Sequence, residues 1–120
     1  MGAMPEKKRE PNYEEFCHNF DELQNDLLNM QQILHEREKS GASFDTIAKE
    51  LESLKEDAQS RLVDLQQLYN QNQNLFPNNS EQILNQCNKW IQNLHPEYLS
   101  QKKWNFNERF LSGFRKNLGM

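Results

Sequence analysis

Residues 13–34 read YEEFCHNFDELQNDLLNMQQIL, and their apolar side chains recur at alternating spacings of three and four residues. This is the a/d repeat of a coiled-coil seam, in which one apolar stripe meets a partner helix. The stripe consists of Tyr13, Phe16, Phe20, Leu23, Leu27, Met30 and Leu34. The stretch therefore predicts a long amphipathic helix that needs a second helix beside it.

The chain supplies that second helix itself, after the turn sequence SGAS at residues 40–43. Ser43 is a suitable N-cap, and Gly41 can adopt the left-handed conformation that ends the first helix. Facing residues in an antiparallel hairpin have numbers that add to a constant, and here the apolar pairs add to 81. We therefore predict an antiparallel helical hairpin over residues 12–76, whose second stripe consists of Phe44, Ile47, Leu51, Leu54, Ala58 and Leu65.

The composition agrees with an elongated helical fold. Hydrophobic residues make up 35% of the 120 residues and the mean hydropathy is -1.05, because a narrow seam needs few apolar side chains. Val63 is the only valine, and no run alternates with a period of two. The predicted fold class is all-α.

The remaining segments are assigned from local signals. We expect residues 1–11 to be a disordered tail, of which residues 1–3 resemble an expression scar, and Asn12 to cap the first helix. Residues 77–120 predict short helices that form one domain with the hairpin and pack on its open end. The first is expected to start at Asn79 or Ser80, the second at Pro96, and the last after a cap at Asn105.

One position does not fit the seam. Arg61 falls where the repeat requires an apolar side chain opposite Phe20, and we expect Leu62 to take its place through a local stutter. Away from the seam, the expected solvated face of the hairpin is mostly acidic. It consists of Glu22, Asp26, Gln31, Glu36, Glu50, Glu52, Glu56 and Asp57.

Charge is segregated along the chain. Residues 1–74 hold 8 basic and 15 acidic side chains, a net charge of -7, whereas residues 75–120 hold 6 and 3, a net charge of +3. The overall charge of -4 argues against a nucleic-acid partner, because neutralising phosphates needs a broad basic surface. We expect the acidic hairpin to attract its own basic C-terminal segment.

Motifs that carry chemistry are not found. Glu15 and His18 have the spacing used in di-iron bundles, but such a site needs the motif twice, and the heptad turns both side chains to solvent. Cys17 and Cys87 make no metal spacing, and no phosphate-binding loop or nucleophile elbow occurs. We therefore predict no enzymatic activity, no metal and no cofactor. Without a long apolar run, we expect a cytoplasmic protein.

The C-terminal segment interleaves basic and aromatic side chains, which leaves two interpretations open. The aromatic side chains are core residues with a cationic rim, or the segment binds a protein partner or an acidic lipid surface. Trp104 is the aromatic residue that we expect to be most exposed. The candidate partner or lipid contacts are Lys102, Lys103, Trp104, Arg109, Arg115 and Lys116.

Asn and Gln account for 27 of the 120 residues. With the hairpin and the small size, the chain resembles the small coiled-coil effectors of intracellular bacteria such as Legionella. Leu118 matches the hydrophobic residue that these effectors often carry near the C-terminus, but Glu108 alone stands where they have a glutamate-rich block. The resemblance implies translocation into a host cell and binding of a host protein or membrane.

These observations lead to a functional expectation. The leading hypothesis is a non-enzymatic adaptor that presents a helical surface to another protein, because a long two-helix seam can be completed by a third helix. That helix comes from a partner or from a second copy, which would make a homodimer through the hairpin. The alternative is a peripheral membrane or phosphoinositide-binding module that uses the basic C-terminal segment.

Overall fold

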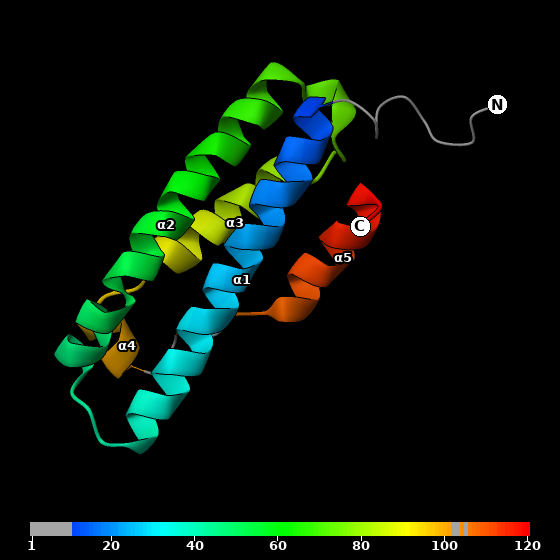
Figure 1. Ribbon diagram of the computed structural model, residues 1–120. Coiled ribbons are helices and arrows are strands. Elements are labelled where there is room, and N and C mark those ends of the chain that lie inside the picture. Colours follow the sequence, from blue (N-terminus) through cyan, green and yellow to red (C-terminus); the bar gives the residue numbers. More distant parts are fainter. Residues whose placement is uncertain (1–10, 102–103, 105) are drawn as a thin grey trace.

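The computed structural model describes residues 11–101, 104 and 106–120, and these residues form an elongated all-α molecule of 58 × 22 × 20 Å (Figure 1). Of the predicted tail, only Pro11 is among the described residues. Three residues of the C-terminal segment also lie outside them: Lys102, Lys103 and Asn105. The elements are α1 (Pro11–Lys39), α2 (Phe44–Gln71), η2 (Gln73–Leu75), α3 (Ser80–Gln92), α4 (Pro96–Ser100) and α5 (Glu108–Leu118). The predicted hairpin of two long helices with a small C-terminal helical cluster is confirmed.

The turn between α1 and α2 has the geometry that its sequence demands. Gly41 has a φ of 81°, a left-handed conformation in which other residues are strained. The Ala42 N–H donates to the Arg37 carbonyl at 3.0 Å and the Gly41 N–H to the Glu38 carbonyl at 3.1 Å, the paired bonds of a Schellman motif. Ser43 then caps α2 by accepting from the Thr46 N–H at 3.2 Å.

The seam lies in the interior of the hairpin. The predicted seam residues of α1 are all buried. In α2, Phe44 and Leu54 stay partly exposed, and the other predicted seam residues are buried. At the misfit, Leu62 is buried and Arg61 is half-buried. The buried seam consists of Tyr13, Phe16, Phe20, Leu23, Leu27, Met30, Leu34, Ile47, Leu51, Ala58, Leu62, Leu65 and Leu68.

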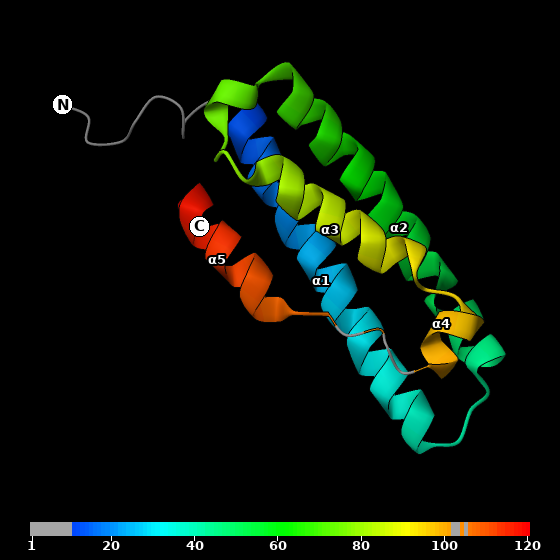
Figure 2. The same ribbon diagram turned by 180° about the vertical axis from the view of Figure 1, so that it is seen from behind.

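The C-terminal helices cover one side of the hairpin. Helix α3 packs along α2 and α5 packs on α1, so that α1 and α2 lie in front in Figure 1 and α3 lies in front in Figure 2. Helix α4 also contacts α2, toward the hairpin turn. The cluster therefore extends well beyond the open end of the hairpin, while the opposite side of the seam has no helix over it among the described residues.

Aromatic side chains close the open end of the hairpin. Phe114 of α5 makes edge-on contacts with Phe16 and Phe20. The ring of Tyr69 contacts Phe76, which also stacks on Tyr13. Phe76 follows η2 in extended conformation before Pro77, which turns its ring back into the core.

Two predicted helix starts are wrong. Asn12 lies inside α1, which has Pro11 as its first described residue, a position that suits proline because no intrahelical N–H bond is lost there. The last helix begins at Glu108 and is capped by Asn107, whose side chain accepts from the Arg109 N–H at 3.1 Å. Phe106 precedes it in non-helical conformation, so Asn105 is not the cap.

The middle of the seam provides a test of this packing. Leu27 is fully buried between α1 and α2, so Leu27→Ala leaves a cavity and should lower the free energy of unfolding by about 2–5 kcal/mol. The matched control is Val63→Ala on α2, because Val63 is 50% exposed and its truncation should change stability by less than about 0.5 kcal/mol. Urea unfolding followed by circular dichroism measures both, and equal effects would contradict the register.

Candidate functional site

The aromatic residue singled out as an exposed contact belongs to the core. Trp104 is buried, and its Nε1–H donates to the Trp90 carbonyl at 2.7 Å, so the expectation of an exposed indole is wrong. The ring of Trp90 in turn makes edge-on contacts with Phe106 and Phe110. In the core the indole ring is removed from water and its one N–H donor has a hydrogen-bond partner. The two lysines before Trp104 in the sequence had suggested an exposed position instead.

The basic residues of α5 do not gather into one free patch. Arg115 pairs with Asp21 of α1 through Nη1 and also donates to Gln24 Oε1 at 3.2 Å. Arg109 and Lys116 are exposed, and Lys102 and Lys103 lie outside the described residues. The apolar face of α5 is buried against the rest of the molecule through Leu111, Phe114 and Leu118.

The acidic surface of the hairpin is divided by the seam into two sides. Gln31 was expected to be solvated, but it donates to the Phe106 carbonyl at 3.2 Å on the covered side. Glu52 and Glu56 also lie on that side, beside the segment that joins α3 to α4. We use the term open face for the uncovered side, formed by Asn19, Glu22, Asp26, Asn29, Ile33, Glu50, Leu54, Asp57, Arg61 and Asp64, which one helical period of about 100° per residue groups together.

Asp26 is the residue of the open face that differs most from expectation. The sequence predicts a solvated side chain, yet Asp26 is only 8% exposed, and its Oδ2 has no hydrogen-bond partner. Across the seam lies Asp57, which is half exposed. Asp26 and Asp57 therefore form a carboxyl pair of like charge that joins α1 to α2 at the edge of the core.

Arg61 lies next to this pair and only partly neutralises it. Its Nη1 donates to Asn19 Oδ1 at 3.0 Å, while its Nε lies 3.7 Å from Asp57 Oδ2, too far for a hydrogen bond. That buried Nε has no hydrogen-bond partner. Arg61 therefore leaves the seam toward the open face, and we name the group of Asn19, Glu22, Asp26, Asp57 and Arg61 the carboxyl cluster.

The environment of Asp26 changes its protonation. Burial, a hydrogen bond with Asp57 and the charges of Asp57 and Glu22 raise the pKa of Asp26 to about 7, while Arg61 opposes the shift. Two carboxylates at one site cannot both ionise cheaply, so the protonated form of Asp26 is favoured. The sequence signal was present: an arginine at a seam position beside aspartates at the facing flank positions of the two helices.

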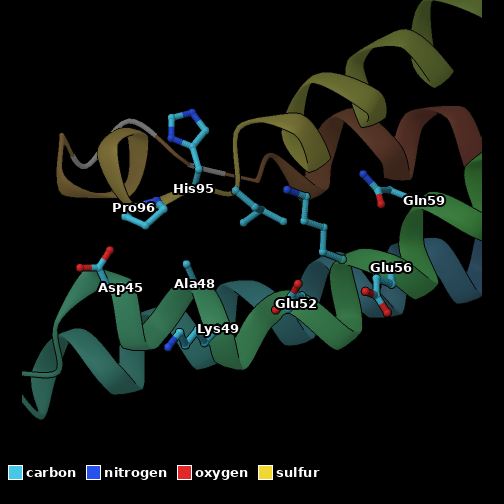
Figure 3. A pocket seen from close by; sticks show the side chains of 10 residues that line it. Asp45, Ala48, Lys49, Glu52, Glu56, Gln59, His95 and Pro96 are labelled. Carbon is cyan, nitrogen blue, oxygen red and sulfur yellow. The ribbon is translucent and has the colours of Figure 1, made fainter.

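The covered side contains a groove between α2 and the segment joining α3 to α4 (Figure 3). His95 lies at its rim, but its Nδ1 accepts from the Tyr98 N–H at 3.3 Å and thereby caps α4. Acidic and basic side chains alternate along the α2 wall. The lining residues are Asp45, Ala48, Lys49, Glu52, Lys55, Glu56, Gln59, Leu94, His95 and Pro96. The alternation gives the groove no charge of one sign with which to select a ligand.

The other residues considered for chemistry lie apart. Glu15 and His18 are exposed on α1, and no group of three His, Cys, Asp or Glu side chains that could hold a metal ion occurs among the described residues. Cys87 is buried, and burial raises the pKa of its thiol to about 12, which keeps the sulfur protonated and unreactive at neutral pH. Within the described part of the chain, no helix is long and apolar enough to cross a membrane.

Comparison of the chain with known protein families, with curated proteins and with solved structures gives no match. The geometry of the molecule is therefore the basis for inferring its function. Two features stand out in that geometry: an uncovered hairpin face, and a carboxyl cluster at its centre that the chain's own side chains satisfy incompletely.

The pKa of Asp26 predicts how stability depends on pH. Because this pKa is raised above its value in the unfolded chain, the folded state binds the extra proton, and its stabilising effect is lost as the pH rises from about 4 through about 7. Asp26→Asn cannot ionise. The stability difference between the wild type and Asp26→Asn should therefore change by up to about 1.4 kcal/mol per pH unit in that range.

Chemical denaturation across this pH range measures the effect. Asp64→Asn is the matched control, because Asp64 is an exposed acid on the same face of α2. Its curve should stay parallel to that of the wild type. Parallel curves for Asp26→Asn as well would contradict the raised pKa.

Proposed function

We propose that the protein is a non-enzymatic interaction module that binds another protein through the open face of its helical hairpin. The observation that supports this proposal is the asymmetry of the hairpin. Helices α3, α4 and α5 pack on one side of the α1–α2 seam, and the other side has no helix over it among the described residues. A two-helix seam of this length offers a groove in which a third helix can lie.

The chemistry of the open face supports a protein partner. Ile33 and Leu54 are only half-buried there and offer apolar contacts toward the hairpin turn. Glu22, Asp57 and Asp64 give the rest of the face a negative charge, to which Arg61 is a partial counterweight. An amphipathic helix with an apolar stripe and a basic flank complements both features.

The same charges make a homodimer through this face the weaker candidate. In a symmetric dimer the open face would meet its own copy, which would bring like charges together around the carboxyl cluster. The peripheral membrane alternative is also less well supported. It needs the apolar face of α5 to meet lipid, but Leu111, Phe114 and Leu118 are buried against the rest of the molecule.

The resemblance to bacterial effectors extends the proposal. Under that resemblance the protein acts in the cytoplasm of a host cell after translocation, and its partner is a host protein. The proposal also includes a cytoplasmic location and the absence of catalysis, since binding through the open face needs neither a nucleophile nor a metal.

A charge reversal on the open face tests the proposal. Asp64→Lys should reduce the amount of partner captured from host-cell lysate by roughly tenfold, because a basic side chain then repels a basic partner. Glu56→Lys on the covered side of α2 is the matched control, since it makes the same charge change at another exposed acid and should leave capture intact. Captured proteins are quantified by mass spectrometry, after circular dichroism shows that both variants fold.

Two results would contradict the proposal. The first is an equal loss of capture in Asp64→Lys and Glu56→Lys, which would indicate nonspecific charge attraction. The second is the absence of any protein enriched by the wild type over both variants. Sedimentation equilibrium of the wild type gives the oligomeric state independently, and a dimer that Asp64→Lys strengthens would assign the open face to self-association.

A further inference from the structure

We propose that the carboxyl cluster is a receptor for one cationic side chain, a lysine or an arginine, presented by the helix of a basic protein partner. This inference rests on the proposed function and names the chemistry of the partner at the centre of the open face. The cluster lies in the flank between α1 and α2, so a helix in the same groove would carry its side chain directly to it.

The first support is the unmet hydrogen-bonding capacity of the cluster. More than nine-tenths of Asp26 is buried, and its Oδ2 has no hydrogen-bond partner. Leaving a buried acceptor unsatisfied costs stability, and a buried charge without a partner costs more. A lysine ammonium with three donors, or a guanidinium with five, supplies what the Asp26 and Asp57 oxygens lack.

The second support is the charge balance. Three carboxyl groups belong to the cluster, Glu22 and Asp26 from α1 and Asp57 from α2, and among the described residues Arg61 from α2 is the one cation that faces them. Arg61 donates to the neutral Asn19 side chain and lies 3.7 Å from Asp57 Oδ2, so its one positive charge faces three carboxyl groups. Helices α3, α4 and α5 lie on the other side of the seam and add no charge to this group.

The other described cations of α1 and α2 near the cluster lie away from it. Lys49 and Lys55 of α2 line the groove on the covered side. Arg37 of α1 donates to Glu50 at 2.7 Å, toward the hairpin turn. Within the described part of the chain no further positive charge faces Asp26, and we assign that role to a partner. Leu54, one turn before Asp57 on the same face, offers apolar surface to the hydrocarbon stem of such a side chain.

A proton and a cation compete for this position. In the free protein the pKa of Asp26 is raised to about 7, chiefly by burial, so a proton binds to this carboxyl near neutral pH. A bound ammonium or guanidinium favours the charged form and lowers that pKa, so binding releases a proton. The affinity for a cationic partner must then increase as the pH rises from about 6 to about 8.

A pair of synthetic peptides tests the inference with the full chain. Both are amphipathic helices of about 20 residues with the same apolar stripe, and they differ only in bearing lysine or glutamine at the flanking positions. Fluorescence anisotropy measures their affinities at about pH 6 and about pH 8. The lysine peptide should bind roughly tenfold more tightly than the glutamine peptide at the higher pH, and its advantage should shrink at the lower pH.

Two variants separate the cluster from general attraction. Asp26→Asn should abolish most of the lysine preference and its pH dependence. Glu56→Gln removes one exposed acid from the covered side of α2, outside the open face, and should retain both. As a second measurement, the carboxyl carbon of Asp26 is titrated by NMR, and saturating lysine peptide should lower its pKa by at least about one unit.

Each contrary outcome has a definite meaning. Equal weakening in Asp26→Asn and Glu56→Gln, or an Asp26 pKa that the lysine peptide leaves unchanged, overturns the inference. A lysine peptide that binds no better than the glutamine peptide also overturns it. In each case the proposed function still stands if Asp64→Lys selectively loses its partner, so failure of the cluster is distinguishable from failure of the open face.

Discussion

The antiparallel register of α1 against α2 is the constraint from which the rest of the structure follows. It is set at one end by the Schellman motif at Gly41, where a single left-handed residue fixes where α2 begins relative to α1. From there the period of the two helices determines every pair across the seam. A shift of one position would move Leu27 and its neighbours out of the core, so the burial of the seam and the conformation of the turn reinforce each other.

The same register brings Asp26 and Asp57 together. Burying the charged guanidinium of Arg61 in the seam would be costly, so this side chain extends sideways to Asn19. Leu62 fills the core on the other flank instead. The hairpin thus has an apolar flank, which α3 and α5 cover, and a polar flank, which no described helix covers. The arginine at position 61 thus marks the boundary between the covered side, on which the C-terminal helices pack, and the open face, which we propose meets a partner.

The long helices and the turn could be predicted from the sequence because their signals are local and periodic. The location of Trp104 could not, since it depends on Trp90 of another helix presenting a carbonyl at the right place. Asp26 was missed for a similar reason: a helical wheel marks it as a flank position, but its burial depends on the neighbour across the seam. The open face itself became visible only once the side of the hairpin on which α3, α4 and α5 pack was known.

The two tryptophans of the chain, Trp90 and Trp104, share a hydrogen bond and lie outside the hairpin. Their emission therefore reports the local environment of the C-terminal helices, whereas the far-ultraviolet circular dichroism signal is dominated by α1 and α2. The molecule thus contains two intrinsic probes for its two layers, without any label. If the two melting curves coincide, the hairpin and the C-terminal helices unfold as one cooperative unit. If the fluorescence transition lies at a lower temperature, the C-terminal helices separate from the hairpin before the hairpin unfolds.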